Sequence, residues 1–368
     1  MQIKISKASL SEALNNVQVV VAAKAPLAIL QNVKMTAKDG KLELTCSDMD
    51  VTLTATADCE VIEEGSTTVP AKTIATAVGK VVDGIVEISV DLSDCATLKA
   101  GPSTFKFKGI SATEFPSIPS DDGVQCSIDC ASLREMLRKT AFAASQDDTR
   151  RTLQGVLLDF GDGGTEVKAV ATDGRRLAIL NCDLGEASGF NGQFIVPKKV
   201  VDIILKKLPK DGKAVLNTAK SQLRITTPHL DILTKLLDEV FPNYMQVIPK
   251  STKETVTVNR VDLMGALDRS SVLTSSDSPT VDFTFKANCI ELNSSDADIG
   301  SSHDEVPIKY DGEEMELRFN PQYIREVLSA LDEDEIEFKL TNGASPAIVR
   351  KSGADDYTYV VMPLRVSA

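Results

Sequence analysis

A short amphipathic segment decides the fold of this chain, and its middle copy reads Ala131-Ser132-Leu133-Arg134-Glu135-Met136-Leu137. Its apolar residues recur three and four positions apart, which is the spacing of a helix that packs one face on a core. Residues 8–14 and 261–267 keep the same apolar positions, and the matching leucines are Leu10, Leu133 and Leu263. A helix near the start of each third of the chain indicates one structural unit in three copies.

Three further landmarks follow each of these helices in the same order. A Ser/Thr-Asp step occurs at residues 47–48, 172–173 and 295–296. A proline suited to the first turn of a second helix occurs at Pro70, Pro197 and Pro321. Each copy closes with an apolar residue and a proline, at residues 115–116, 241–242 and 362–363. Chance similarity among helix starts is the weaker explanation of four landmarks in one order.

The landmarks recur at a spacing of about 120–130 residues, which is a common domain size. Polar, turn-rich stretches at residues 117–123 and 249–253 separate the copies. We therefore predict three domains, at residues 1–120, 121–250 and 251–368. Each domain combines two helices with β-strands, so the predicted fold class is α+β.

The chain closes with an apolar stretch, Tyr359-Val360-Val361-Met362-Pro363-Leu364-Arg365-Val366. Its alternation predicts a final strand. Pro363 cannot donate to a strand ladder, so we expect an edge strand or a strand end at this point. Because no further domain follows to cover it, we expect this stretch to form one wall of a pocket for a partner.

The overall composition is that of an ordinary soluble protein, with 42% hydrophobic and 25% charged residues. The net charge of -13 argues against a general nucleic-acid coat but allows a local basic surface. The sequence contains no apolar run of about 18 residues, so we predict no membrane span. Its N-terminus lacks the features of a signal peptide, and we expect a cytoplasmic protein.

The predicted helices carry much of the positive charge, at Lys72, Lys80, Arg134, Arg138, Lys139, Lys198, Lys199 and Lys206. Several of these residues are four positions apart and project from the same helical face. One interpretation is that they only keep the protein soluble. The other is a basic surface that holds a phosphate backbone without reading its sequence. Since no aromatic-rich strand suggests base stacking, duplex DNA is the better ligand for such a surface.

Sequence motifs of the common enzyme classes are missing. There is no P-loop and no dinucleotide-binding glycine motif, and residues 161–164 read as a hairpin turn. The carboxylate pairs Asp48/Asp50 and Asp296/Asp298 allow a metal site, but their place in the repeat favours a structural turn. We therefore predict a protein that is not an enzyme and needs no metal or cofactor.

Three stretches together resemble the bacterial sliding clamp, the beta subunit of DNA polymerase III. They are Ala171-Thr172-Asp173-Gly174-Arg175-Arg176-Leu177-Ala178, Phe241-Pro242-Asn243-Tyr244 and the closing stretch. The similarity covers the whole chain. It implies a DNA polymerase processivity factor, a head-to-tail homodimer in which each chain forms half of a ring around duplex DNA. The implied partners are DNA polymerase III, other polymerases, the clamp loader and repair proteins.

The resemblance also implies site residues. Partner peptides would dock in a cleft on the third domain and its junction with the second, at Leu153, Thr172, Gly174, Arg175, Arg176, Leu177, Pro242, Val247, Val360, Met362, Pro363 and Arg365. Further DNA contacts would come from Lys24, Arg150 and Arg151. Arg151-Thr152 replaces a tyrosine pair of some members, so Arg151 would hold phosphate where an aromatic ring would stack. Arg175 stands where histidine is frequent.

A seam between two chains would pair the first domain with the third. Residues 104–107 alternate like an edge strand, with Phe105 and Phe107 on one face, and Val272 and Leu273 match the apolar partner positions. The alternative is that the two phenylalanines form an internal core face. The rival to the clamp as a whole is a scaffold of three repeated domains that binds proteins and not DNA.

Overall fold

The computed structural model describes residues 1–22, 24–119, 123–162, 164–219, 221–274, 279–296 and 298–364. The chain separates into two compact units. Unit 1 comprises Met1–Ala131 and Asp202–Leu236, and unit 2 comprises Ser132–Val201 and the chain from Leu237 on.

Each third of the chain contains two α-helices, as the repeat predicts. They are α1 (Lys7–Val17), α2 (Ala71–Lys80), α3 (Cys130–Thr140), α4 (Lys198–Lys207), α5 (Arg260–Ser270) and α6 (Pro321–Ala330). α1, α3 and α5 each begin one residue before the predicted segment. Their matching leucines, Leu10, Leu133 and Leu263, are at most 1% exposed, which confirms the core-facing side. Single turns of 3-10 helix are η1 (Gln18–Val20), η2 (Ala28–Gln31), η3 (Ala112–Glu114), η4 (Ala141–Ala143), η5 (Arg151–Leu153), η6 (Tyr244–Val247) and η7 (Ser271–Leu273).

The recurring proline before the second helices marks their starts, with one difference from the prediction. Pro321 is the first residue of α6, and the Asn320 side chain caps that helix by accepting a hydrogen bond from Gln322 N at 2.9 Å. Pro70 and Pro197 instead end the strands that lead into α2 and α4. Proline fixes φ near −65°, and this value suits the end of a strand as well as the first turn of a helix. Pro70, at the end of its strand, has φ −57°.

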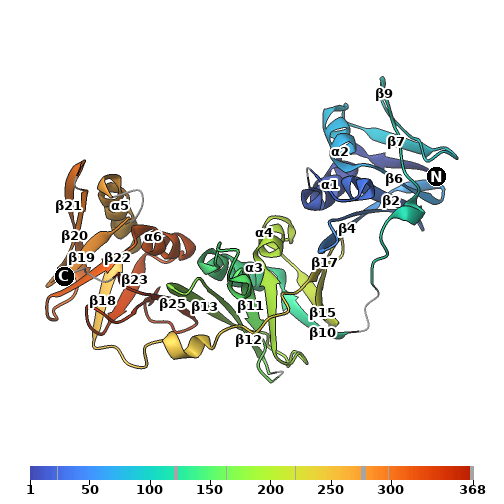
Figure 1. The fold of residues 1–368 in the computed structure, drawn as a ribbon. Helices are drawn as coiled ribbons and strands as arrows, with labels where there is room; N and C mark the ends of the chain where they lie inside the picture. Colours follow the sequence, from blue (N-terminus) through green and yellow to red (C-terminus); the bar gives the residue numbers. More distant parts are fainter. Residues whose placement is uncertain are drawn as a thin grey trace. The chain divides into compact units, whose positions relative to one another are not determined.

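Unit 1 contains a five-stranded sheet, β5-β1-β7-β8-β9, and an eight-stranded sheet, β10-β15-β16-β17-β4-β3-β2-β6, in its described residues. α1 and α2 pack on each other and on the second sheet (Figure 1). The strands are β1 (Gln2–Ser6), β2 (Asn32–Lys38), β3 (Lys41–Ser47), β4 (Val51–Asp58), β5 (Glu60–Glu63), β6 (Gly65–Pro70), β7 (Ile85–Val90), β8 (Ala96–Ala100), β9 (Ser103–Phe107), β10 (Val124–Asp129), β15 (Lys213–Ala219), β16 (Gln222–Thr226) and β17 (Leu230–Lys235).

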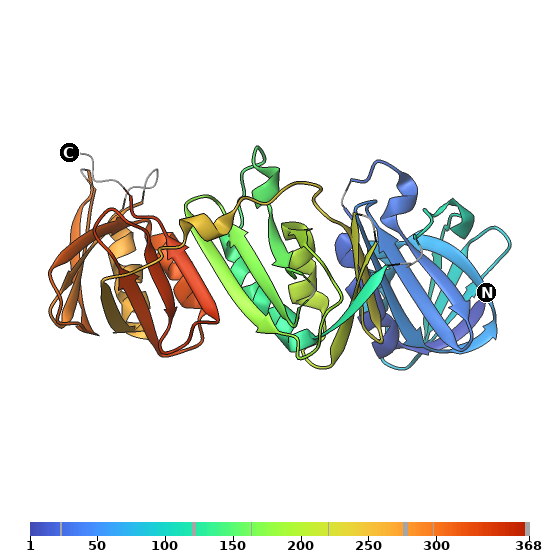
Figure 2. The same ribbon diagram turned by 90° about the horizontal axis from the view of Figure 1, so that it is seen from below.

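In its described residues, unit 2 contains one twelve-stranded sheet, with the strand order β14-β11-β12-β13-β25-β24-β23-β18-β21-β20-β19-β22. α5 packs on α6, β20 and β21, and α6 also contacts β25 (Figures 1 and 2). The strands are β11 (Gly155–Asp159), β12 (Glu166–Thr172), β13 (Arg176–Asp183), β14 (Gln193–Pro197), β18 (Glu254–Asn259), β19 (Val281–Lys286), β20 (Cys289–Asp296), β21 (Gly300–Lys309), β22 (Met315–Phe319), β23 (Glu335–Leu340), β24 (Ala347–Lys351) and β25 (Tyr357–Val361).

Backbone ladders cross both boundaries between repeats. β17 of the middle third pairs with β4 of the first, and β13 of the middle third pairs with β25 of the last. The two compact units therefore divide the middle third between its two sheets. The predicted final strand exists as β25, but it lies between β13 and β24, so the expectation of an edge strand is wrong. Pro363 follows the strand, which ends at Val361, and the alternative of a strand end is confirmed.

Aromatic packing fills the core of the last third. Phe283, Phe285 and Phe319 are fully buried, and the rings of Phe283 and Phe319 meet edge to face at 5.3 Å between centroids. Such pairs add to the free energy gained by burial of the rings. Packing of these buried rings therefore stabilises this part of unit 2.

We predict that Phe283→Ala destabilises unit 2 by about 3 kcal/mol, because the lost ring leaves a cavity among rigid neighbours. The measurement is the shift in the midpoint of guanidinium unfolding. Ile299→Ala is the control, since Ile299 is 66% exposed. Equal shifts for the two variants would contradict the assignment of Phe283 to the core.

Candidate functional site

The Thr172–Arg176 segment forms a tight turn between β12 and β13. Thr172 Oγ1 accepts a hydrogen bond from Gly174 N at 3.0 Å, and Asp173 Oδ1 accepts from the backbone N–H groups of Arg175 and Arg176. Gly174 has φ +84°, and a Cβ there would lie 3.2 Å from the Arg150 guanidinium. The turn therefore requires glycine, and its side-chain bonds fix where β13 begins.

The same turn recurs at the other two Ser/Thr-Asp steps. Asp48 Oδ1 accepts from the N–H groups of residues 50 and 51, and Asp296 Oδ1 accepts from those of Asp298 and Ile299. This confirms the interpretation of the carboxylate pairs as structural turns. Within the described ranges, no group of three or more His, Cys, Asp or Glu residues has the arrangement of a metal site.

An apolar cluster lies beside the turn in unit 2, and it gathers residues from both sides of the β13–β25 ladder. Its buried members are Leu153, Leu157, Val170, Leu177, Ile179, Ile195, Phe241, Tyr244, Ile348 and Val360, and the half-buried Leu237 and Ile248 pack against it. Three predicted cleft residues, Leu153, Leu177 and Val360, belong to it. The sequence reasoning missed most of the others, since their only signal is strand alternation.

Other predicted cleft residues are more exposed. Val247 is 50% and Met362 is 42% exposed, and Pro242 is also exposed. Pro363 is half-buried, and Arg365 lies outside the described residues. Met362 N donates to Arg175 O at 3.0 Å, so the exposed methionine directly adjoins the turn. The structure thus places apolar surface next to polar turn groups, a combination typical of ligand-binding sites.

Unit 1 has a matching corner at the β17–β4 ladder, where Lys235 N donates to Asp50 O at 2.9 Å. There the side chains of Lys235 and Asp50 form an ion pair at 3.0 Å. The corresponding residues in unit 2 are Met362 and Arg175, which cannot form such a pair. The two corners therefore share one backbone arrangement and differ in the side chains at the rim.

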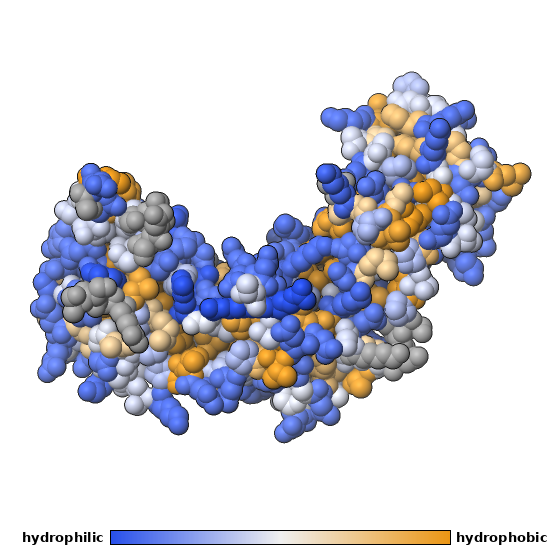
Figure 3. Space-filling model, viewed as in Figure 1, coloured by the Kyte–Doolittle hydropathy of each residue, from blue (hydrophilic) through white to orange (hydrophobic). Residues whose placement is uncertain are grey.

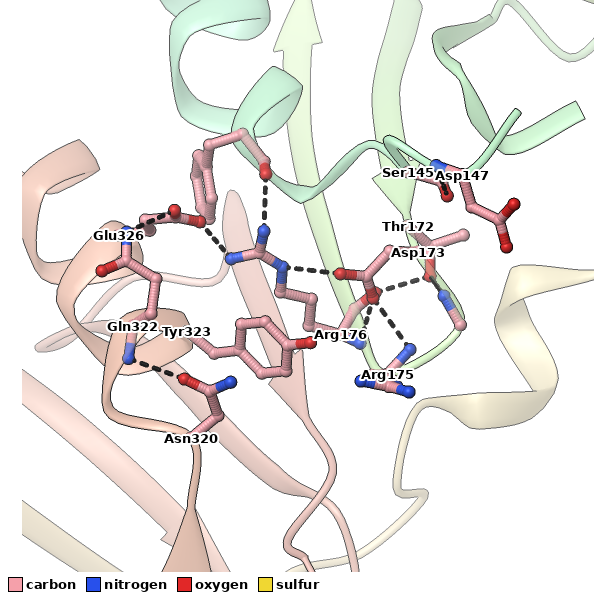
Figure 4. Close-up of polar contacts among 12 residues, drawn as sticks. Ser145, Asp147, Thr172, Asp173, Arg175, Arg176, Asn320, Gln322, Tyr323 and Glu326 are labelled. Atoms are coloured by element: carbon pink, nitrogen blue, oxygen red, sulfur yellow. Dashed lines mark hydrogen bonds and ion pairs between the residues drawn. The ribbon is translucent and has the colours of Figure 1, made fainter. Parts of the chain in front are cut away.

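Arg176 is a predicted cleft residue that the structure turns toward α6. Its guanidinium forms ion pairs with Asp173 (3.0 Å) and Glu326, and it donates to Phe142 O at 2.8 Å (Figure 4). The Tyr323 ring lies 4.4 Å from the guanidinium carbon, a cation–π contact. Residues on successive strand positions face opposite sides, so Arg176 points away from the cluster that Leu177 joins.

The surroundings of Arg176 favour its charged form. Burial acts to lower its pKa, but Tyr359, Glu326 and Asp173 together raise the pKa well above its ordinary value. Its charge is therefore used inside the protein, where it ties the start of β13 to α6. Nothing in the sequence indicates this link, because Arg176 and Glu326 lie 150 positions apart.

The predicted DNA-binding lysines on α2 and α4 are mostly accessible. Lys72 and Lys80 lie on the exposed face of α2, opposite the buried Ile74 and Val78, as predicted. On α4, Lys199 and Lys206 are exposed and Lys198 is half-buried. Lys24 is exposed in the loop before η2. Hydrophilic side chains predominate around α3 in the view of Figure 3.

Two predicted DNA contacts on α3 have other roles. Lys139 is 3% exposed and pairs with Glu135 at 2.9 Å, so its charge does not reach a ligand surface. Arg138 donates to Ala330 O at 2.9 Å and pairs with Asp332 at 2.5 Å. Arg134 is half-buried. The helical spacing could not show that Ala330 O and Asp332 of another segment meet Arg138, or that Lys139 is buried.

Arg150 and Arg151 are both exposed, and they differ in their contacts. Arg150 pairs with Asp147 at 3.5 Å and donates to Asp173 O at 3.2 Å, so it covers the turn described above. Arg151 lies in η5 and forms no ion pair with the residues that the structure describes. Arg151 is therefore the better candidate of the two for a phosphate contact.

Three of the four predicted seam residues are at least partly accessible, and Phe107 is buried. β9 is the last strand of its sheet and, among the described strands, pairs only with β8, which confirms the predicted edge strand. Phe105 is half-buried and its ring stacks on that of Phe107, which is 7% exposed. Val272 is 73% exposed in η7, and Leu273 is half-buried.

Among the described residues, no helix is both long and apolar enough to cross a membrane.

We predict that Arg176→Met lowers the free energy of unfolding by about 2 kcal/mol, because Asp173 and Glu326, only 16% and 28% exposed, lose their shared partner. Thermal unfolding measures the effect. Arg175→Gln is the control, because it removes the same charge one residue away from an exposed side chain. If both variants unfold like the original protein, Arg176 does not brace the turn.

Comparison with known proteins assigns all three repeats. The family model of the DNA polymerase III beta subunit, N-terminal domain, matches residues 1–119. The models of the central domain and the C-terminal domain match residues 127–243 and 245–365. The chain thus contains three clamp domains of mixed helix and sheet.

Full-length relatives agree with this assignment. The chain is 30% identical over 370 residues to the beta sliding clamp of Pseudomonas aeruginosa and 31% identical over 375 residues to that of Caulobacter vibrioides, with all of each chain covered. A crystal structure of the DNA polymerase sliding clamp from Pseudomonas aeruginosa matches with a TM-score of 0.94 and 29% identity, again over the whole of both chains. The chain therefore belongs to the family of beta sliding clamps, the beta subunits of DNA polymerase III.

Proposed function

We propose that this protein is a DNA polymerase processivity factor that works without catalysis, as a ring of two chains around duplex DNA. The observation that carries the proposal is the match of all three domains, over their full length, to proteins named beta sliding clamps. The domains correspond to residues 1–120, 121–250 and 251–368, and the site of action is the cytoplasm. A ring holds DNA by its topology, so it needs no sequence readout.

The proposed contacts with DNA come from lysines on α2 and α4. Lys72, Lys80, Lys199 and Lys206 are exposed on helices, where flexible ammonium groups reach phosphate oxygens. Contacts to phosphate alone are independent of base sequence. In a protein of net charge -13, a few such residues attract DNA locally while the remaining surface repels it. Weak contacts of this kind permit sliding.

The proposed seam joins β9 of one copy to β21 of the other. β21 pairs with β20 along its length but meets β18 only at Ile308 and Lys309, so residues 300–307 have one edge open among the described strands. η7, which carries Val272 and Leu273, contacts β21. Lys106 on β9 and Glu305 on β21 are both exposed and opposite in charge. Open edges with complementary charge suit strand pairing between chains.

The proposed partner site is the edge of the apolar cluster at the β13–β25 ladder. Met362 and Val247 offer exposed apolar surface there, and buried neighbours hold the floor rigid. A short peptide with one or two aliphatic side chains fits such a site. DNA polymerase III, other polymerases, the clamp loader and repair proteins would reach DNA through it.

The topological mechanism predicts different behaviour on circular and linear DNA. Protein loaded onto nicked circular DNA by a clamp loader should remain bound through gel filtration, and a single restriction cut should release it. The measurement is the amount of protein that elutes with DNA before and after cutting. Retention on the linear product would mean surface binding, and the ring would be wrong.

Replacing Lys72, Lys80, Lys199 and Lys206 with alanine should weaken DNA retention. Removal of each lysine–phosphate interaction should reduce the slope of log K against log salt by about 0.9. Binding is measured by fluorescence anisotropy at several salt concentrations. The matched control replaces Lys38, Lys41, Lys250 and Lys309, which are exposed outside these helices. Equal losses of affinity in both variants would show an effect of net charge alone, which favours the protein-binding scaffold.

The seam predicts a solution mass of about twice the chain mass of 39.5 kDa. Phe105→Asp should reduce it to that of one chain, because a charge would be buried between the two strands. Light scattering measures the mass. Leu92→Asp is the control, since Leu92 is fully exposed at a hairpin tip of the same sheet. A Phe105→Asp protein that keeps the double mass would remove β9 from the seam.

A further inference from the structure

A cavity of about 410 Å³ opens beside the β12–β13 turn in unit 2. Charged side chains dominate its lining, namely Asp147, Arg150, Asp173, Arg175, Arg176 and Glu326. Three are basic and three are acidic, so the cavity carries no formal net charge. Nevertheless, not every arginine of the lining has an ion pair, and this difference bears on which ligand the cavity binds.

Two of the arginines have acidic partners. Arg176 is paired with Asp173 and Glu326, and Arg150 is paired with Asp147 at 3.5 Å. These pairs use all three carboxylates of the lining. Each pair holds its groups in place, so neither arginine is available without loss of an internal contact.

Arg175 is the exception. It is exposed, and no carboxylate among the described residues forms an ion pair with it. A side-chain hydrogen bond with Tyr323 raises its pKa above the ordinary value, so its guanidinium stays charged. In Figure 4 its side chain lies beside Tyr323 at the rim of the site. The cavity thus presents one arginine that has no ion pair of its own, beside the Asp173 carboxylate that already pairs with Arg176.

The matching corner of unit 1 shows what this position looks like when it is balanced. Asp50 has the place of Arg175, and Lys235 has the place of Met362. Asp50 and Lys235 neutralise each other across the ladder at 3.0 Å. In unit 2 the partner position is the apolar, 42% exposed Met362. The cation and the apolar side chain therefore offer two different contacts at one point of the rim.

We propose that Arg175 makes this site select peptides that carry a carboxylate beside an aliphatic side chain. The aliphatic group would contact Met362 and the apolar cluster, and the carboxylate would accept paired hydrogen bonds from the Arg175 guanidinium. This specificity rests on the proposed function of the cluster edge as a peptide site. The carboxylate comes from an aspartate or glutamate side chain or from a peptide C-terminus.

A peptide fits the site better than the phosphates of a DNA strand. The arginine adjoins apolar surface, since Met362 N donates to Arg175 O, and a phosphate backbone gains nothing from that surface. With three basic and three acidic side chains, the lining also gives no net attraction to a chain that carries a charge at every nucleotide. A single carboxylate needs only the one arginine at the rim.

The test selects peptides from a random nonapeptide display library on the full-length protein. Enriched sequences are synthesised with their acidic residue or its amide counterpart, each as a free acid and as a C-terminal amide. Their dissociation constants are measured by fluorescence anisotropy. We expect acidic residues near leucine-like ones to be enriched. Arg175→Gln should weaken acidic peptides about fivefold, as for a solvent-exposed ion pair, and their amide counterparts less than about twofold.

Two variants serve as controls. Arg175→Lys keeps the charge and should retain most of the preference. Arg325→Gln makes the same substitution on α6, where Arg325 pairs with Asp268 away from the cavity, and it should change nothing. The preference should also weaken as salt is added. Loss of the preference on C-terminal amidation alone would assign the carboxylate to the peptide terminus, and its persistence would assign it to a side chain.

The outcomes separate the selectivity from the peptide site itself. Enrichment of neutral peptides with unchanged affinity for Arg175→Gln would overturn the selectivity and leave the site in place. Affinity that survives Met362→Asp would put peptide binding elsewhere and overturn both. If Arg175→Gln instead weakens binding of a twelve-nucleotide single-stranded DNA and leaves all peptides unaffected, Arg175 is a phosphate contact and the inference is wrong.

Discussion

Backbone hydrogen bonding between neighbouring repeats is the interaction on which the rest of this structure depends. The β4–β17 and β13–β25 ladders join the strands of one repeat to those of the next, so no repeat presents an unpaired sheet edge at these boundaries. The ladder also fixes register, which places Val360 opposite Leu177 and Met362 next to Arg175. The candidate peptide site is a direct consequence of that register.

The repeat gives the chain two corners with the same backbone arrangement, and the side chains at the two corners differ. In unit 1 an exposed ion pair, Asp50–Lys235, covers the rim. In unit 2 the rim carries the apolar Met362 and the cationic Arg175, and the buried Arg176 forms an ion pair with Asp173 of the turn. The repeated fold thus leaves one candidate site rather than two, because the residues that differ are those that neutralise charge and cover apolar surface.

Several features followed from the sequence because they depend on local spacing. The starts of α1, α3 and α5 to within one residue, the antiparallel pairing of β11 with β12 as a hairpin, and the edge position of β9 were all predicted. Leu153, Leu177 and Val360 were assigned to the site through the resemblance. Lys139 and Arg176 show where such reasoning stops. Each was placed on a ligand surface, but Lys139 is buried and paired with Glu135 of its own helix, and Glu326 turns Arg176 toward α6.

By itself the sequence determined that this protein has three copies of one α+β unit, and its motifs pointed to the clamp family. Apolar periods and turn residues act within a few positions, so they can be read along the chain. Only the tertiary structure decided that β25 is an inner strand and that Arg138 and Arg176 serve internal contacts. It also decided that Arg175 stands without a carboxylate partner among the described residues. These outcomes depend on which distant segments meet, and the register of the ladders between repeats sets those meetings.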